Sequence, residues 1–536
     1  MGAKKNIRIF CIVVIVQCIV IMTWGTQKER LNVDEMFTME GAKQGGNGMR
    51  YWDISEDFYG NEHTNAEFLS HLTVYEDELL IYQGLPTVIK SLGNRNLYYV
   101  IINLAASIYP GHIPWLVGVV VNLIYFVIAQ FVLYLLMQEI HSDVAALCSV
   151  IIYGFSAGAI SMVLYVRCYM MLTMLELLLV YLYIRFVKTE KWWERLICLI
   201  CSGVLALVSY RTHQFGTILF AVITALFLIY IVANKKKKCM VWLTAVYGIL
   251  FVGGIRVILP RIHGFLSGNI AELFYCSVKN ISLEQLFLQF LQLSKIIAEH
   301  LFANVSVMFL AISVMFVLCM VEMYREKKKH ILNSMQMNCE RKNRVDWIII
   351  MLIGLVAIIY YSILLLGNAV AWKYMSPAYP IVVMVFTVGI CSIWRYLGHY
   401  KMLIPVIGVC LLLASYDTQH ISEMYTGEKA CREELEMKYH GVNGIMVHHD
   451  SQGIGQNWLY EAATLWPQDS NVMVIQNRML YEKELCYNRE DNKILLWLTG
   501  DYDNEEAINR FRELTEYTKM ELVMSTDSLR IFECNK

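Results

Sequence analysis

The chain has 536 residues, of which 57% are hydrophobic and only 17% are charged, and its mean hydropathy is +0.46. This composition excludes an ordinary soluble domain and is typical of a protein with many membrane-spanning helices. The formal net charge of −1 gives no excess of positive charge for a phosphate backbone, so we expect no nucleic-acid partner.

The first apolar segment, residues 7–24, is long enough to cross a bilayer as a helix. Lys4, Lys5 and Arg8 stand at its N-terminal end. Because basic residues collect on the cytoplasmic side of membrane proteins, the N-terminus is predicted to be cytoplasmic. The polar stretch that follows, about 27–112, would then be a long extracytoplasmic loop.

Apolar runs recur through the rest of the first 416 residues. They cover about 113–137, 144–165, 168–187, 196–210, 213–233, 240–259, 301–321, 347–366, 377–394 and 402–415. With the first segment they make about eleven spans, and the loops expected on the cytoplasmic side hold the basic clusters, such as Lys235 to Lys238. An odd number of spans puts the C-terminal tail outside, on the side of the first loop.

The tail, 417–536, has a different pattern. Short buried-strand patterns occur at 444–448, 471–475, 493–498, 520–524 and 529–532, and a helical period occurs at 505–517. The sequence therefore predicts a polytopic α-helical membrane protein, residues 1–416, with a small extracytoplasmic C-terminal α/β domain, residues 417–536.

Asp34 and Glu35 are the candidate catalytic residues, because they follow the first span closely and open the long outer loop. Acids near a helix end are often only solvated. A carboxylate at the membrane surface could instead take the proton of an acceptor hydroxyl while an anomeric carbon loses a phosphate. That chemistry is sugar transfer.

Further candidates lie at breaks between apolar runs on the expected outer side. Arg167 is either a residue that snorkels to lipid headgroups or a cation for a lipid-linked phosphate. His213 lies in the next outer break and could be an ordinary interfacial residue. Lys373 and Tyr374 lie in an aromatic stretch that would also suit an interfacial belt.

Four segments in this order resemble motifs of the GT-C glycosyltransferases, in particular the bacterial relatives of protein O-mannosyltransferases and of the lipid A aminoarabinose transferase. They are Asp34-Glu35; Asn96-Leu97-Tyr98-Tyr99, similar to His-Pro-Pro-Leu-Tyr-Tyr; Arg167-Cys168-Tyr169 followed by Thr212-His213-Gln214-Phe215-Gly216, similar to Thr-His-Tyr-x-Gly; and Lys373-Tyr374-Met375-Ser376-Pro377-Ala378, similar to Arg-Tyr-Leu-x-Pro-Ala. The resemblance covers about residues 4–416. Gly93-Asn94-Arg95-Asn96 stands where His-Pro-Pro is expected, and Glu76, Asp77 and Glu78 are open candidates for a second loop acid.

The resemblance implies a GT-C fold, a polyprenyl-phosphate sugar donor and an acceptor glycan, lipid or protein of the cell envelope. Asp34 would be the general base, with Glu35 orienting it or sharing its charge. Arg167 and Lys373 would hold the donor phosphate, and the remaining motif residues that would contact substrate are Tyr169, His213 and Tyr374. Members of the class differ in their use of a divalent cation, so no cofactor is certain and such an ion stays open.

Two other classes of function compete with a transferase. A transporter or flippase for lipid-linked glycans would carry charged residues within its spans, and Glu176 is one such residue. An inactive GT-C-like protein could also serve as a scaffold.

Overall fold

The computed structural model describes most of the chain. It describes residues 2–43, 59–92, 97–234, 241, 282–302, 347–396, 421–425, 427–448, 462, 465–467, 469–476, 480, 491–499, 504–526 and 529–536. The chain forms two compact units. The membrane unit comprises Met1–Trp24, Val120–Leu164 and Cys168–Ser422; the sheet unit comprises Gly25–Val119, Tyr165–Arg167 and Glu423–Lys536.

Within the described ranges, seven helical segments are long and apolar enough to cross a membrane. They are α1 (Gly2–Gly25), α7 (Trp115–Ile140), α10 (Tyr169–Lys188), α11 (Trp192–Thr212), α12 (Gln214–Ala233), α17 (Trp347–Leu366) and α19 (Tyr379–Tyr396) together with the short α18 (Trp372–Met375) before it. The prediction of a polytopic α-helical membrane protein is confirmed. The expected spans at 240–259, 301–321 and 402–415 fall almost entirely outside the described residues.

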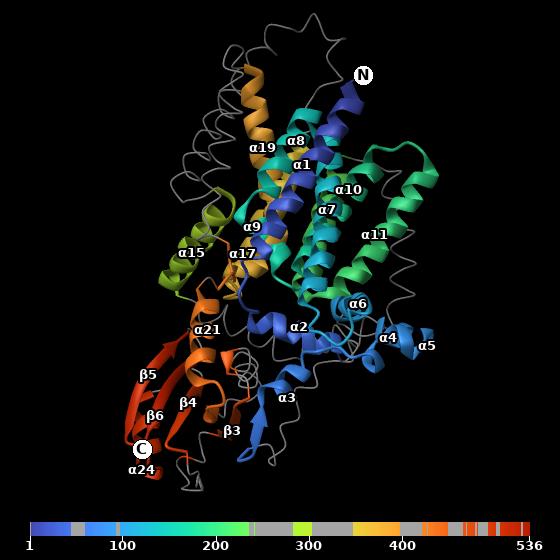
Figure 1. Cartoon of the computed structure of the whole chain (residues 1–536). Coiled ribbons are helices and arrows are strands. Elements are labelled where there is room, and N and C mark those ends of the chain that lie inside the picture. The colour runs from blue at the N-terminus through green and yellow to red at the C-terminus, as the bar shows by residue number, and fades with distance from the viewer. Residues whose placement is uncertain are drawn as a thin grey trace, which may run out of the picture. The chain divides into compact units, whose positions relative to one another are not determined.

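Several helices of the membrane unit pack against more than one neighbour (Figure 1). α10 contacts α11 and α12, and α17 contacts α12 and α19. α15 (Leu283–Phe302) was not predicted, because polar residues such as Gln285, Gln289 and Lys295 lower the hydropathy of that segment.

The expected span at 144–165 is broken in the structure. α8 (Asp143–Gly154) and α9 (Ala157–Leu164) meet at an angle of 59°. Ser156 stabilises the break, because its hydroxyl donates to the Tyr153 carbonyl (2.7 Å) and accepts from the Ala159 N–H (3.2 Å). Gly154 fits beside Gln17 and Gln130 so closely that an added Cβ would lie 2.2 Å from the Gln130 Nε2.

The sheet unit combines the first loop with the C-terminal tail. Its loop elements are α2 (Val33–Lys43), β1 (Glu62–Thr64), α3 (Asn65–Ser70), η2 (Glu76–Glu78), α4 (Leu80–Gln83), α5 (Leu85–Leu92) and α6 (Leu97–Ala106). Its tail elements are α21 (Glu428–Tyr439), β2 (Gly444–His448), β3 (Asn471–Gln476), β4 (Lys493–Thr499), α24 (Asn504–Leu514), β5 (Lys519–Ser525) and β6 (Leu529–Asn535). The five predicted tail strands and the helix are all present.

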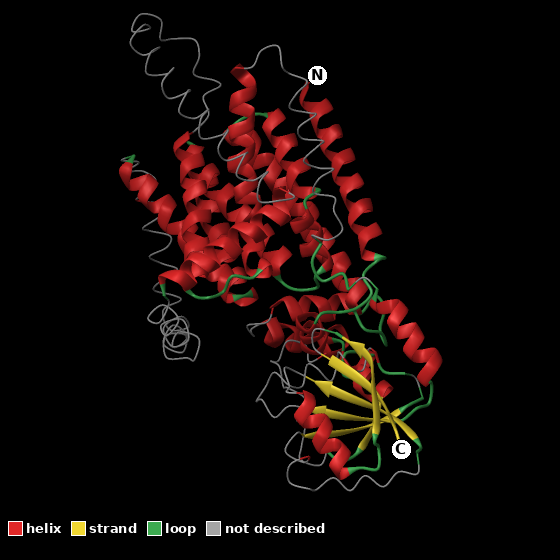
Figure 2. Cartoon of the chain, turned by 90° about the vertical axis from the view of Figure 1, so that its left-hand side faces the viewer, coloured by secondary structure: helices red, strands yellow, loops and turns green. Residues whose placement is uncertain are grey.

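Among the described residues, six strands form one sheet in the order β1-β3-β2-β4-β6-β5. The strands are yellow in Figure 2. β2 runs parallel to β3 and β4, and the other pairings are antiparallel. β1 was missed in the sequence, because its three residues, Glu-His-Thr, have no apolar alternation. Its pairing with β3 ties the first loop to the tail, so a strand from the first loop and the strands of the tail share one sheet. The domain boundary at 416 stays a prediction.

Alternate residues of the strands face two separate cores. Met446, Val474 and Trp497 pack on the side covered by α3 and α21, where Phe68 and Tyr439 are buried. A second core on the opposite face packs against α24, where Phe511 is buried; its strand residues are Ile445, Val447, Ile475, Ile494, Leu496 and Leu498. The sheet is therefore covered on both faces, as its nearly continuous apolar strands require.

Glu533 on β6 gives the sheet a pH-dependent stability. Its carboxylate accepts a hydrogen bond from the Tyr439 hydroxyl (2.6 Å) and lies 3.2 Å from the Lys493 Nζ. The Tyr439 hydrogen bond, with smaller contributions from Asn535 and Lys493, lowers the pKa of Glu533 to about 2.

A pKa that is lower in the folded state means that the carboxylate stabilises the sheet above its ordinary pKa and stops doing so as the pH falls to about 2. We expect amides of β4 and β6 to exchange hydrogen faster between pH about 4.5 and 2, after correction for the intrinsic rate. Glu533→Gln should lack this part of the pH dependence. An identical pH response in both proteins would contradict the assignment.

Candidate functional site

The N-terminus of α2 is built by a local capping pattern, Asn32-Val33-Asp34-Glu35. The Asn32 Oδ1 accepts from the Asp34 N–H (2.8 Å), and the Asn32 carbonyl accepts from Glu35 and Met36 (2.9 and 3.0 Å). In return the Glu35 carboxylate accepts from the Asn32 N–H (2.8 Å). Such a reciprocal cap fixes where the helix begins, and both acids fall in its first turn, where the helix dipole favours negative charge.

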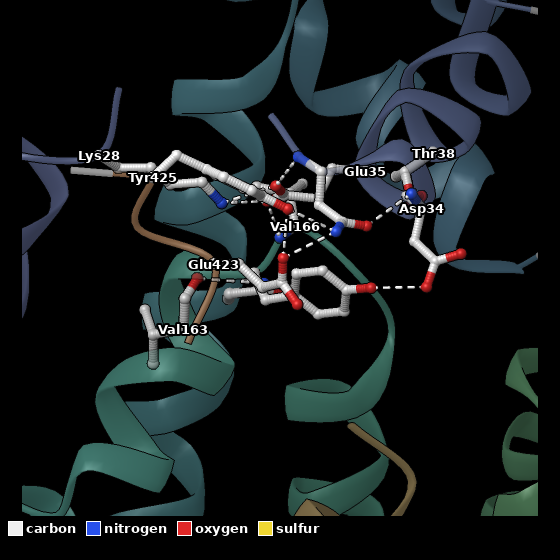
Figure 3. Close-up of polar contacts among 11 residues, drawn as sticks. Lys28, Asp34, Glu35, Thr38, Val163, Val166, Glu423 and Tyr425 are labelled. Carbon is white, nitrogen blue, oxygen red and sulfur yellow. Dashed lines mark hydrogen bonds and ion pairs between the residues drawn. The ribbon is translucent and has the colours of Figure 1, made fainter. Parts of the chain in front are cut away.

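Glu35 has a fully buried carboxylate. Lys28 places its Nζ 2.6 Å from both carboxylate oxygens (Figure 3). The Val166 N–H donates to the Oε1 at 2.8 Å, in addition to the Asn32 N–H on the Oε2. Both oxygens are thus engaged by donors of the protein itself. Burial and this saturation fit a residue that holds the site together rather than one that exchanges protons with a substrate.

Asp34, its neighbour, is in a different environment. Its carboxylate is only partly buried, and its Oδ2 accepts a hydrogen bond from the Tyr165 hydroxyl at 2.6 Å. Tyr165 itself is buried, so it can fix the orientation of the carboxylate. A partly buried carboxylate that is held by a hydroxyl donor can accept a proton from an approaching hydroxyl.

Arg167 is fixed against the same helix. Its Nη1 donates to the Asp34 carbonyl (2.9 Å), the Thr38 hydroxyl (3.3 Å) and the Tyr99 hydroxyl (3.0 Å). Tyr99 lies on α6 and packs so closely on α2 that a Cβ at Gly41 would lie 2.4 Å from its ring. Three of the predicted motifs, those of Asp34, Tyr99 and Arg167, therefore meet in the sheet unit.

The other predicted substrate-binding residues meet in the membrane unit. Tyr169, His213 and Tyr374 form an aromatic cluster, with ring centroids 5.5 Å apart for Tyr169–His213 and 6.0 Å apart for Tyr169–Tyr374. Phe215 adds a ring 4.6 Å from that of Tyr374. His213 caps α12, because its Nδ1 accepts from the Phe215 N–H (3.2 Å). In the neutral ring the proton then resides on Nε2.

Lys373 stands at the edge of this aromatic cluster. Its Nζ lies 5.4 Å from the centroid of the Tyr374 ring, within the range of a cation–π contact. The short helix α18 that carries both residues is held by α17, where the Tyr360 hydroxyl donates to the Tyr374 carbonyl (2.7 Å). The Lys373 ammonium thus lies beside the aromatic rings of this cluster.

The sequence alone assigned no role to three residues of the site, Lys28, Asn32 and Tyr165. Lys28 and Asn32 carry a local signal, since Asn-x-x-Glu is a helix-capping pattern and Lys28 precedes it closely. Tyr165 had a weaker signal, as it lies two residues before Arg167 in the same polar break.

The described residues give no group of three or more His, Cys, Asp or Glu side chains placed to hold a metal ion. Beside Asp34 the second carboxylate, that of Glu35, is already bound to Lys28 and two backbone N–H groups. Among the described residues, the carboxylate of Glu35 is therefore not available to a metal ion.

Comparisons with known proteins found similar chains only among solved structures. No protein-family model matches the chain, and no curated protein matches it. Among solved structures, the chain is similar to ArnT from Cupriavidus metallidurans, crystallised with undecaprenyl phosphate: 9% identity, a TM-score of 0.49, and coverage of 99% of this chain and 98% of that one. A similarity at this level assigns neither a family nor an activity.

The Lys28–Glu35 pair predicts a large stability effect. Lys28→Met leaves a buried carboxylate without its cation, which should lower the free energy of unfolding by about 3–5 kcal/mol. The double variant Lys28→Met/Glu35→Gln should recover part of this loss, because the uncompensated charge is gone. Unfolding in mixed micelles measures both values.

The matched control is Lys429→Met. Lys429 pairs with Glu433 at 3.9 Å, with both side chains largely exposed, and such a pair contributes about 0–1 kcal/mol. Equal losses of unfolding free energy in Lys28→Met and Lys429→Met would show that the buried pair contributes no more to stability than the exposed pair.

Proposed function

We propose that this integral membrane protein is a glycosyltransferase of the GT-C type. It would move a sugar from a polyprenyl-phosphate donor to an envelope glycan, lipid or protein on the extracytoplasmic face. The observation that carries the proposal is the contrast between the two adjacent acids. The carboxylate of Glu35 is buried and fully bonded, whereas that of Asp34 is partly exposed and oriented by Tyr165. The motif resemblance singles out the same pair.

In this mechanism Asp34 accepts the proton of the acceptor hydroxyl as its oxygen forms a bond to the anomeric carbon. The bond from that carbon to the phosphate oxygen breaks, and its electron pair leaves with the polyprenyl phosphate. A single displacement of this kind inverts the anomeric configuration. The Tyr165 hydroxyl keeps the Asp34 carboxylate aimed while it gains the proton.

Arg167 would stabilise the negative charge that develops on the leaving phosphate. A guanidinium suits this role because its planar donors match phosphate oxygens, and a group fixed in advance needs no reorganisation during the reaction. The contacts of its Nη1 with α2 and Tyr99 supply that fixation. Lys373, with the aromatic cluster of Tyr169, His213 and Tyr374, would contribute further contacts to the substrates.

The test uses the purified protein with short-chain polyprenyl-phosphate sugars and follows release of polyprenyl phosphate. Asp34→Asn should lower turnover by about 100-fold or more, since general-base catalysis contributes about 10²–10⁴-fold. Asp469→Asn is the control: it changes an exposed aspartate of the sheet unit, and Asn tolerates its left-handed backbone (φ 57°). Equal turnover in Asp34→Asn and wild type would refute Asp34 as the base.

One observation favours a transporter as the second candidate. Glu176 lies within α10, its side chain is buried, and neither of its oxygens has a hydrogen-bond partner among the described residues. Buried acids within spans often mark ion or proton paths. Flipping of a lipid-linked sugar in liposomes by wild type, lost in Glu176→Gln, together with no release of polyprenyl phosphate, would favour this alternative.

A further inference from the structure

The side chain of Asn32 joins two distant parts of the chain. Its Nδ2 donates to the Glu423 Oε2 and to the Tyr425 hydroxyl oxygen, both at 2.7 Å, and the Tyr425 hydroxyl donates to the same Glu423 carboxylate. At the other end of the amide, the Oδ1 accepts the N–H of Asp34 at 2.8 Å. One amide group therefore connects the segment 423–425 to the backbone of Asp34.

The backbone of this segment is unusual. Glu423 has φ 62° and Tyr425 has φ 53°, in the left-handed region that glycine adopts freely and that residues with side chains rarely enter. Both side chains nevertheless reach the same amide of Asn32. Backbone conformations of this kind are often kept at functional sites. Glycine could make this turn as well. It would not supply the two side chains that bond to Asn32.

Further contacts hold the segment along residues 29–32. The Arg30 guanidinium carbon lies 4.1 Å from the centroid of the Tyr425 ring, and its Nε lies 2.9 Å from the Glu428 carboxylate. The Glu29 N–H donates to the Met424 carbonyl (3.2 Å). Burial, with the nearby charge of Glu423, raises the pKa of Tyr425, so its phenol stays protonated and can donate.

These contacts do more than supply acceptors for the backbone N–H groups at the N-terminus of α2. The N–H groups of Asp34, Glu35 and Met36 are already bonded to Asn32 without any help from the C-terminal segment. What Glu423 and Tyr425 add is a fixed side-chain rotation of Asn32, because both acceptors meet the same Nδ2. That rotation places the Oδ1 that holds the Asp34 backbone.

We propose that Glu423 and Tyr425 are positioning residues for Asp34: by holding the Asn32 amide they fix the first turn of α2, so that the C-terminal segment completes the catalytic site. This inference rests on the proposed function and adds a dependence of turnover on residues distant from the chemistry. Displacement of a catalytic group by about 1 Å can cost about 100-fold in rate.

The first experiment compares Glu423→Gly with Asp469→Gly in turnover of the short-chain donor. Both positions have a left-handed backbone, so glycine should be tolerated at each, and only Glu423→Gly removes a contact with Asn32. We expect kcat to fall about 10- to 100-fold in Glu423→Gly, with the donor KM changed by less than about two-fold. Glu423→Gln keeps an acceptor oxygen and should retain most of the rate, whereas Asp469→Gly should match wild type. A wild-type kcat in Glu423→Gly would overturn the proposal.

The second experiment needs no activity. Hydrogen exchange of the amides of residues 33–36 should be faster in Glu423→Gly and in Tyr425→Phe than in wild type, and unchanged in Asp469→Gly. Wild-type exchange in both Glu423→Gly and Tyr425→Phe would overturn the positioning role, whatever the protein catalyses. Faster exchange in the variants, together with no release of polyprenyl phosphate by wild type, would instead refute the proposed function and leave the contact between the C-terminal segment and α2 unaffected.

Discussion

The buried charge of Glu35 is the interaction on which the candidate site depends. A carboxylate removed from water is tolerated only when a cation and hydrogen-bond donors replace the lost hydration. Here the cation is Lys28, and the donors are the backbone of Asn32 and of Val166. These partners come from three places: the segment before α2, the cap of α2, and the short stretch 165–167. One side chain therefore fixes three segments of the sheet unit around the start of one helix.

The same arrangement explains why two adjacent acids differ. Successive side chains of an α-helix point about 100° apart, so burying Glu35 turns Asp34 toward another side of α2. There it meets the Tyr165 hydroxyl, one residue before the Val166 N–H that binds Glu35. Arg167, the next residue, binds the Asp34 carbonyl. Three consecutive residues thus contact the acid pair, each through a different group.

The sequence predicts what contiguous residues determine. Long apolar runs identify the described spans, and short apolar runs identify the five strands of the tail, because burial of whole helices and strands is visible in local hydropathy. The bend between α8 and α9 was missed, since Ser156 ends one helix and caps the next without interrupting the apolar pattern. Asp34 and Glu35 could be located but not assigned separate roles, which needs the positions of Lys28, Tyr165 and Val166. The contact of Asn32 with Glu423 spans 391 positions of the chain, and no local pattern indicates it.

The central claim is that Asp34 performs the chemistry and Glu35 maintains the site. Thermal unfolding and turnover per folded molecule, measured together on Asp34→Asn and Glu35→Gln in the same detergent, test it most directly. Asp34→Asn should unfold at the wild-type temperature and lose turnover. Glu35→Gln should unfold at a lower temperature, while its folded fraction still turns over donor. A stable but inactive Glu35→Gln beside an active Asp34→Asn would reverse the two roles and contradict the account.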